Sequence, residues 1–343
     1  MATRSTVGIA LIGAGRWGPN LLRNFNDDPR SQVLWVVDRD PERLAAVAMR
    51  YPGVQLSPRI RDPLADPEVC AIVIATPAGT HAELARHALV AGKHCLVEKP
   101  LATNSVDAVG LVQLAQSRRC ILAVGHVFLH NPAIRHAKAC IDDGRLGHPY
   151  YASMVRTNLG PPGIDVNVAW DLATHDVSIA TYWFGDPPLF ASARGGCWIS
   201  PGREDTIFAT LLYPRDRLVH IVASWLSPRK VREITLVGSR SMVTIDDMNT
   251  AEPVRVHDKG IDAGVSADFV DSHGAFRASI RDGEVRIPRV AMGEPLREEC
   301  EDFLDCILTG RAPVASGASA LSTVRTIEAI NRSLRNGGCQ EPV

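Results

Sequence analysis

A strand, a glycine-rich turn and a helix follow one another at the beginning of this chain and constrain its fold more than any other stretch. Val7 to Leu11 is an unbroken apolar run, Gly13 to Gly18 reads Gly-Ala-Gly-Arg-Trp-Gly, and apolar residues then recur at helical spacing over 21–25. Gly13 permits the tight turn, Gly15 lets the backbone approach a pyrophosphate, and Gly18 lets the helix pack closely on the strand. The pyrophosphate would lie at the positive end of the helix dipole. The pattern predicts a dinucleotide site.

A second strand supports this prediction because it ends on an acid at the expected distance. The apolar run Val33 to Val37 is followed by Asp38, 20 residues after Gly18, where a carboxylate would hold the adenosine ribose hydroxyls. A carboxylate there repels a 2'-phosphate, although the neighbouring Arg39 reduces this repulsion. We therefore expect NAD as the cofactor, with NADP as the less favoured alternative.

Strands and helices alternate regularly through the first third of the chain. Helices are predicted over 41–50, 82–90 and 105–117, and strands over 54–56, 71–75, 95–97 and 121–125. Such alternation with continuous apolar strands is typical of a parallel sheet covered by helices on both faces. Ligands of these sheets bind beyond the carboxyl ends of the strands, where Gly13, Asp38, Thr76 and Lys99 fall.

The pattern changes near residue 127. A helix is predicted from Asn131 to Asp143, and alternating segments follow over 150–159, 189–198, 206–213, 218–226, 231–237 and 241–245. The stretch 246–286 gives no assignment, and two amphipathic helices are predicted over 296–307 and 321–334. We expect an α/β protein with an N-terminal doubly wound Rossmann domain at 1–127 and a C-terminal α+β domain with an open mixed or antiparallel sheet at 128–343.

Composition excludes several classes of partner. The net charge of -1 and the isoelectric point of about 6.8 leave no basic excess, so nucleic acid and anionic membranes are not expected partners. The eight cysteines are scattered without a C-x-x-C pair, so we expect reduced thiols and no metal site. The first residues carry no signal-peptide pattern, and no apolar run reaches membrane-spanning length. The expected location is the cytoplasm.

The most informative segment of the second half is a predicted helix that ends at Phe184. Most of it is apolar, but Asp171, His175, Ser178 and Tyr182 fall at i, i+4, i+7 and i+11 and form a polar stripe on one face. One interpretation of Asp171 and His175 is a hydrogen-bonded core pair, because buried polar groups usually have partners. The other interpretation is a functional site.

A lysine supplies a further chemical group, because the short apolar strand from Cys95 ends on Glu98-Lys99-Pro100. A lysine at a strand end is most often solvated. Oxidation of an alcohol by a nicotinamide, however, needs a base for the hydroxyl proton and a fixed cation for the developing alkoxide. Histidine titrates near neutral pH, so His175 is the predicted base, Lys99 the predicted cation and Asp171 the predicted orienter of the imidazole.

Together these motifs resemble the Gfo/Idh/MocA oxidoreductase family, most closely the branch that contains UDP-N-acetylglucosamine 3-dehydrogenases. The resemblance implies an N-terminal Rossmann domain and a C-terminal sheet domain used for substrate binding and oligomerisation. It also implies a bound nicotinamide, a homodimer or homotetramer, and a cis bond between Lys99 and Pro100. The motifs that carry it are Gly13 to Gly18, Ala75-Thr76-Pro77 to Thr80-His81, Glu98-Lys99-Pro100, Asp171 to His175, Ser224-Trp225-Leu226 and Pro295 to Cys300.

The expected site residues fall into three groups. The catalytic set is Lys99, Asp171 and His175. The expected cofactor-binding residues are Gly13, Ala14, Gly15, Arg16, Trp17, Gly18, Asp38, Arg39, Thr76, Pro77, His81, Glu98, Lys99 and Pro100. The expected substrate-binding residues are His126, Arg156, Asn158, Asp165, Asn167, Trp170, Asp171 and His175.

Charge near the expected substrate pocket favours one substrate class. The branch tends to carry a basic residue before Asp-Val-Asn, whereas this chain has none over 159–164. Loss of that cation weakens binding of a diphosphate, and Asp165 and Asp171 would tolerate a cationic aminosugar. We therefore expect oxidation of a secondary ring hydroxyl of a sugar or aminosugar moiety to a ketone, as in an aminoglycoside-like secondary metabolite. The expected partner is a small carbohydrate or aminocyclitol glycoside.

Several alternatives remain open. Arg156, Arg229 and Lys230 would restore anion binding if they point inward, and a UDP-N-acetylglucosamine-type sugar-nucleotide 3-dehydrogenase would then fit. An inositol dehydrogenase or a ketoreductase is also compatible with the motifs. The alternative from another class is a non-catalytic regulator that senses nicotinamide, because fold alone does not establish catalysis. A zinc-dependent alcohol dehydrogenase and a serine hydrolase are disfavoured, since the sequence has neither a zinc ligand cluster nor a G-x-S-x-G turn.

Overall fold

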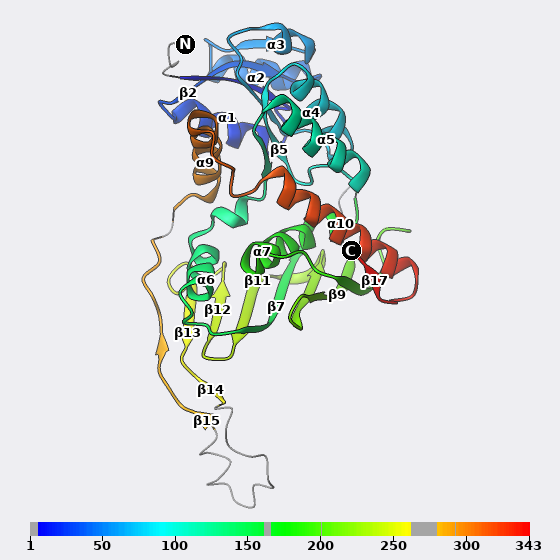
Figure 1. Cartoon of the computed structure of the whole chain (residues 1–343). Coiled ribbons are helices and arrows are strands. Elements are labelled where there is room, and N and C mark those ends of the chain that lie inside the picture. Colours follow the sequence, from blue (N-terminus) through cyan, green and yellow to red (C-terminus); the bar gives the residue numbers. More distant parts are fainter. Residues whose placement is uncertain (1–5, 161–165, 200, 262–279, 292) are drawn as a thin grey trace, which may run out of the picture. The chain divides into compact units, whose positions relative to one another are not determined.

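The computed structural model describes residues 6–160, 166–199, 201–261, 280–291 and 293–343 (Figure 1). The chain forms two compact units. The N-terminal unit takes residues up to His130 together with Gly293–Glu328, and the C-terminal unit takes Asn131–Met292 together with Ala329–Val343. Each unit is built around its own sheet.

Among the described residues, the N-terminal unit holds a sheet of six parallel strands in the order β3-β2-β1-β4-β5-β6. This order reverses between β1 and β4, which is the arrangement of a dinucleotide-binding Rossmann sheet. The predicted doubly wound parallel sheet is therefore confirmed. The strands are β1 (Val7–Ile12), β2 (Ser31–Val37), β3 (Gln55–Ser57), β4 (Ala71–Ile74), β5 (His94–Glu98) and β6 (Leu122–Gly125).

The helices of this unit begin where the sequence supplies caps. The side chain of Asp40 accepts a hydrogen bond from the backbone N–H of Glu42 before α2, and that of Asn104 accepts one from Asp107 before α5. The predicted helices 41–50, 82–90 and 105–117 are confirmed to within one residue. The helical elements are α1 (Gly18–Asp27), α2 (Pro41–Arg50), α3 (Arg61–Ala65), η1 (Ala78–Thr80), α4 (His81–Val90), α5 (Ser105–Arg118), η2 (Val127–His130) and α9 (Pro295–Thr309).

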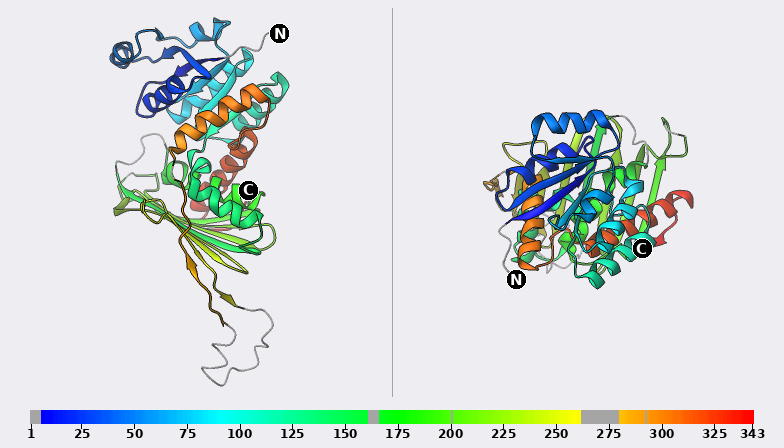
Figure 2. Two further views of the ribbon diagram at one scale, coloured as in Figure 1. Left: turned by 90° about the vertical axis from the view of Figure 1, so that its left-hand side faces the viewer. Right: turned by 90° about the horizontal axis from the view of Figure 1, so that it is seen from above.

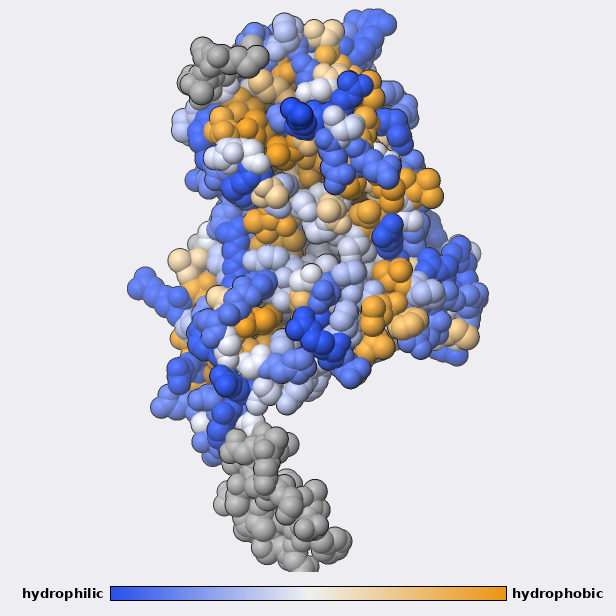
Figure 3. Space-filling view, in the orientation of Figure 1, coloured by the Kyte–Doolittle hydropathy of each residue, from blue (hydrophilic) through white to orange (hydrophobic). Residues whose placement is uncertain are grey.

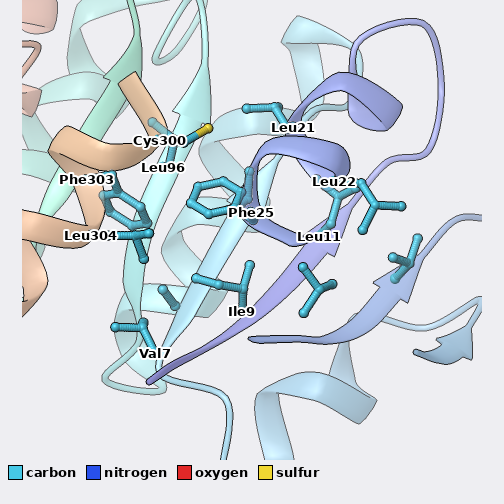
Figure 4. Packing of buried hydrophobic residues seen from close by; sticks show 14 of the residues in the cluster. Val7, Ile9, Leu11, Leu21, Leu22, Phe25, Leu96, Cys300, Phe303 and Leu304 are labelled. Atoms are coloured by element: carbon cyan, nitrogen blue, oxygen red, sulfur yellow. The ribbon is translucent and has the colours of Figure 1, made fainter. Parts of the chain in front are cut away.

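Helix α9 lies far along the chain but packs into the N-terminal unit. Figure 4 shows its residues Cys300, Phe303 and Leu304 among the buried side chains of β1, α1 and β5. The rings of Phe25 and Phe303 meet edge to face, with centroids 6.3 Å apart. The sequence predicted a single boundary after residue 127, whereas the apolar stripe of α9 returns residues 293–328 to the first unit.

Nine described strands of the C-terminal unit form one sheet in the order β16-β13-β12-β11-β7-β10-β9-β8-β17. Strands β7 and β10 run parallel and the other neighbouring pairs run antiparallel, so the predicted mixed sheet is confirmed. The strands are β7 (Pro149–Leu159), β8 (Phe190–Gly196), β9 (Thr206–Tyr213), β10 (Arg217–Ser224), β11 (Leu226–Gly238), β12 (Met242–Asp246), β13 (Val254–His257), β16 (Val285–Arg286) and β17 (Glu341–Pro342).

Helices α6 (Pro132–Asp142) and α7 (Thr174–Phe184) lie over one face of this sheet (Figure 2). Side chains on the central strands alternate accordingly between buried and exposed. Tyr151, Phe208 and Leu218 lie on the other face and are 46%, 50% and 45% exposed. Helix α10 (Gly317–Arg335) begins in the first unit and ends in the second.

Two local features differ from the sequence interpretation. The predicted helix before Phe184 begins with a π-helical turn, η3 (Ala169–Ala173), and continues as α7. The unassigned stretch 246–286 contains β13, β16 and a two-stranded ribbon of β14 (Gly260–Ile261) and β15 (Ile280–Arg281), while residues 262–279 lie outside the described part.

In the view of Figure 3, hydrophobic residues form groups among hydrophilic ones. A search of the described helices found none with the length and apolar character needed to cross a membrane.

Candidate functional site

The glycine turn has the geometry that a pyrophosphate requires. Gly13 has a φ of +97°, and a Cβ there would lie 2.5 Å from the carbonyl oxygen of Ala75, so a side chain is excluded. A Cβ on Gly18 would lie 2.0 Å from the carbonyl oxygen of Gly13. A Cβ on Gly15 would meet, among the described residues, only the guanidinium of Arg43 within 4 Å. The backbone at Gly15 is therefore accessible to a ligand at close range, as binding of a dinucleotide pyrophosphate requires.

Asp38 follows β2 and braces the same turn. Its Oδ2 accepts a hydrogen bond of 2.7 Å from the backbone N–H of Ala14, and its Oδ1 accepts one of 2.9 Å from Asp40. Arg43 Nη1 lies 3.5 Å from Asp38 Oδ2. The neighbouring Arg39 is exposed, as are Arg16 and Trp17 on the turn. Among the described residues, Arg43 is thus the cation beside Asp38, and the predicted cofactor-binding role of Arg39 stays a prediction.

His81 connects two of the predicted motifs. Its ring is buried, with Nδ1 2.7 Å from the carbonyl oxygen of Pro100 and Nε2 2.8 Å from that of Thr76. Burial lowers the pKa of this imidazole, so it is neutral at physiological pH and donates one of these hydrogen bonds. His81 thus ties the turn after β4 to the cis bond between Lys99 and Pro100, and both of its ring nitrogens face protein carbonyls.

Glu98 and Lys99 stand at the carboxyl end of β5. Both side chains are half-buried. Glu98 Oε2 accepts a hydrogen bond of 3.2 Å from the backbone N–H of Lys99, and Glu98 also accepts one from the side chain of Trp17 on the glycine turn. Burial raises the pKa of Glu98 to about 7, while Lys99 and these hydrogen bonds oppose that rise.

His126 follows β6 and is deeply buried. It is 2% exposed, and neither ring nitrogen has a hydrogen-bond partner among the described residues. Burial lowers the pKa of His126 to about 3, helped by the charges of Lys99 and His130. The imidazole is neutral at physiological pH, and its buried nitrogens leave hydrogen-bonding capacity for a ligand or water.

In the C-terminal unit, Asp171 lies in the π-helical turn η3. Its Oδ2 accepts a hydrogen bond of 3.1 Å from the indole Nε1 of Trp225, which is 2% exposed. His175 follows in the first turn of α7 and is half-buried. Single π-helical turns inside helices occur frequently at functional sites. Trp225 lies between β10 and β11, so its hydrogen bond fixes the carboxylate of Asp171 from a distant part of the chain.

The rest of the predicted polar stripe does not converge on one point. Ser178 Oγ donates to the carbonyl oxygen of His175, 2.7 Å away, within the same helix. The ring of Tyr182 lies under the ammonium of Lys138, at 5.8 Å from the ring centroid. Asp171 and His175 remain the members of the stripe that we regard as candidates for chemistry.

Arg156 and Asn167 are held within the C-terminal unit. Arg156 forms a buried ion pair with Asp176 on α7, with Nη2 2.8 Å from Oδ1. Asn167 Nδ2 donates to Glu204 at 2.6 Å and to Asn331 at 2.7 Å. These contacts brace the sheet and helices, and the pairing of Arg156 offsets the positive charge that was considered for anion binding.

The remaining predicted substrate residues are less constrained. Asn158 and Trp170 are half-buried, and the backbone N–H of Trp170 donates to Asn167 Oδ1 at 3.3 Å. Asp165 lies outside the described residues. Arg229, the other arginine considered for anion binding, pairs with Glu233 at 3.0 Å, and its side chain is 78% exposed.

Sequence reasoning missed two polar residues near these groups. Trp225 was noted only as part of a family motif, although a tryptophan between Ser224 and Leu226 in a strand connection could have suggested a buried donor. Glu299 on α9 was noted only within a longer motif, and its burial depends on packing that the sequence does not reveal. In the described part of the chain, no group of three or more His, Cys, Asp or Glu residues could hold a metal ion.

Comparison with known protein families covers both units. Residues 7–126 match the oxidoreductase family with an NAD-binding Rossmann fold, and residues 134–244 match the GFO/IDH/MocA C-terminal domain. The chain belongs to the GFO/IDH/MocA oxidoreductase family. As a member of this family it is an oxidoreductase with an NAD-binding Rossmann domain, which confirms the predicted family, enzyme class and cofactor.

Several relatives align over most of the chain. UDP-N-acetylglucosamine 3-dehydrogenase of Acidithiobacillus ferrooxidans is 27% identical over 290 residues, covering 84% of this chain and 85% of that protein. The NAD(+)-linked scyllo-inositol 2-dehydrogenase of Bacillus subtilis is 24% identical over 341 residues, covering 96% and 94%. The crystal structure of GenD2 from gentamicin A biosynthesis, in complex with NAD, has a TM-score of 0.82 and 23% identity, covering 100% and 98%. This last likeness is one of fold.

Proposed function

We propose that this chain is an NAD-dependent dehydrogenase that oxidises a secondary ring hydroxyl of a sugar or aminosugar moiety to a ketone. The observation that carries the proposal is the fixed carboxylate of Asp171, held by the buried Trp225 one turn before His175. A non-catalytic regulator would need the glycine turn but would have no use for this arrangement or for Lys99.

In the proposed reaction His175 takes the hydroxyl proton, and Asp171 keeps the imidazole oriented and stabilises its positive charge. Lys99 stabilises the developing alkoxide with a fixed ammonium. NAD+, when bound, accepts the hydride from the carbinol carbon. The products are a ketone, NADH and a proton. Asp38 and the turn from Gly13 to Gly18 bind the adenosine and pyrophosphate.

The aminosugar preference rests on charge. Residues 159–164, which precede Asp-Val-Asn in the sequence, include no basic residue, and the positive charge of Arg156 is offset by Asp176. A sugar nucleotide is the second candidate, favoured by the relative from Acidithiobacillus ferrooxidans, whose name gives UDP-N-acetylglucosamine as its substrate. An inositol is the third, favoured by the Bacillus subtilis relative.

A substrate screen tests the proposed function. Purified protein with NAD+ would be incubated with an aminoglycoside, UDP-N-acetylglucosamine, a neutral N-acetylglucosamine glycoside and scyllo-inositol, and NADH absorbance followed. We expect the highest kcat/KM for the aminoglycoside. Equal turnover of the UDP-sugar and its neutral glycoside would contradict the charge argument. If none of these compounds yields NADH and the Lys99→Ala variant keeps the biological activity of the wild-type protein, the non-catalytic regulator is favoured.

The variant Trp225→Phe tests the bracing of Asp171. It removes the indole donor but keeps an aromatic ring, and loss of one hydrogen bond to a carboxylate should lower kcat about tenfold. The KM for NAD+ should not change. Trp183→Phe is the matched control, because the indole of Trp183 is also buried and donates to the carbonyl oxygen of Ile134 at 3.0 Å. Equal losses of kcat in both variants would indicate a packing effect.

Oligomerisation is proposed from family resemblance. The exposed apolar side chains of Tyr151, Phe208 and Leu218 on the open face of the sheet support a homodimer or homotetramer. Light scattering of the purified protein measures this directly.

A further inference from the structure

Glu299 is a carboxyl group in an unusual environment. It lies on α9, is 3% exposed, and neither carboxylate oxygen has a hydrogen-bond partner among the described residues. An isolated ionised carboxylate is very costly to bury without partners. Burial without partners therefore favours the protonated form of this carboxyl group. Burial raises the pKa of Glu299 well above its ordinary value, and the charges of Glu98 and Asp302 raise it further.

Helix α9 packs against the strand that carries Glu98, and the charge of Glu98 acts on Glu299. Cys300, the residue after Glu299, packs in the same core cluster as Leu96 of β5 (Figure 4). Leu96 and Glu98 are two residues apart on one strand, so their side chains point to the same face of the sheet. Glu98 lies opposite Gly125 of β6, and a Cβ on Gly125 would come within 2.9 Å of Glu98 Oε2. The missing side chain leaves room for the carboxyl group.

Few positive charges compensate this pair of acids. On α9, Asp302 is paired with Arg311 at 2.7 Å, and Cys300 has a thiol whose pKa is raised by burial and by the nearby acids. His126, which follows β6, is affected by Lys99 and by His130 of η2, and burial keeps it neutral. The cation acting on Glu98 is that of Lys99, on the same strand end.

We propose that Glu98 and Glu299 act as a coupled carboxyl pair that carries at most one negative charge, and that ionisation of this pair favours binding of NAD+ over NADH. Glu299 is a positioning residue, because it acts through Glu98. The inference rests on the proposed function, which puts the nicotinamide ring beyond the carboxyl end of β5. The ring of NAD+ is positive and that of NADH is neutral, so a negative carboxylate nearby stabilises the oxidised form selectively.

The sign of the pH dependence follows from the protonation of the pair. Since the pKa of Glu98 is about 7, the pair is neutral below this pH and singly negative above it. The ratio of the Kd for NADH to the Kd for NAD+ should therefore rise roughly tenfold between pH 6 and pH 8. Titration calorimetry of the full chain with each form of the cofactor measures this ratio without any substrate.

Three variants separate the pair from simple packing. Glu98→Gln should make the ratio independent of pH over this range. Glu299→Gln should move the midpoint to lower pH, because an amide can donate to Glu98 and stabilise its ionised form. Glu299→Leu keeps the site apolar and should not lower the midpoint. Glu301→Gln, a more exposed acid on the same helix, is the matched control and should leave the curve unchanged.

Two results would overturn the inference. One is a ratio that does not change between pH 6 and pH 8 in the wild-type protein. The other is a midpoint that stays the same in Glu299→Gln and Glu299→Leu while only the thermal stability changes, since a structural role would give that pattern. If the wild-type protein binds neither NAD+ nor NADH, the proposed function fails together with the inference. If it binds both without a pH step, the inference alone fails.

Discussion

Replacing Lys99 by alanine is expected to lower kcat about 1,000-fold, the size of effect seen when one preorganised group that stabilises a developing oxyanion is removed. This corresponds to about 4 kcal/mol of transition-state stabilisation. The affinity for NAD+ should change little, because Gly13 to Gly18 and Asp38 provide the proposed contacts to the pyrophosphate and ribose. Steady-state kinetics with the best substrate of the screen, together with calorimetric titration of NAD+, measure the two effects separately.

A matched control lies at the other end of β5. Lys93 precedes β5, and its ammonium donates to the carbonyl oxygens of Asp66 and Val69 at 2.9 and 2.7 Å. Lys93→Ala therefore removes a lysine that supports the opposite end of the strand and should lower thermal stability while leaving kcat unchanged. If Lys99→Ala binds NAD+ normally and keeps full turnover, the assignment of Lys99 as the alkoxide stabiliser is wrong.

Replacing His175 by asparagine is expected to lower kcat between about 100-fold and 10,000-fold, the range for loss of a general base. The asparagine keeps a polar side chain in the first turn of α7 but cannot accept the hydroxyl proton. The variant should therefore lose the acidic limb of the pH profile of kcat/KM, and turnover should recover partly at high pH, where the substrate hydroxyl ionises more readily. The pH profile separates a lost base from a misfolded helix.

His87→Asn serves as the control for this variant. His87 is exposed in the last turn of α4, so its replacement should change neither kcat nor the pH profile. Retention of the acidic limb in His175→Asn, with kcat within a few fold of the wild type, would assign the proton transfer to another group.

The N-terminal unit could be predicted from sequence because its signals are local. The apolar strands, the glycine turn and the capping residues Asp40 and Asn104 each specify their element within a few residues. The predicted bounds of the strands and of the helices at 41–50, 82–90 and 105–117 agree with the structure to within one or two residues, whereas the short helix α3 was not predicted. The parallel sheet follows from the alternation of strands and helices.

The sequence did not predict which partner each polar side chain of the C-terminal unit contacts. Arg156, a predicted substrate residue, lies on the buried face of β7 and pairs with Asp176, one residue after His175, a partner that the sequence did not reveal. Ser178 and Tyr182 share the spacing of Asp171 and His175, yet Ser178 bonds to its own helix and Tyr182 packs under Lys138. Periodicity gives the face of a helix but not the partner of each residue on it.

The sequence by itself determined the family and the Rossmann fold, because each motif that carries them is a short local stretch, and it supplied the residues that we propose for the chemistry. Only the tertiary structure decided that α9 returns to the N-terminal unit, that Trp225 holds Asp171, and that Glu299 is buried where the charge of Glu98 acts on it. The physical reason is that these contacts join segments separated by more than 50 residues, and the packing of apolar side chains selects them with no local signal in the sequence.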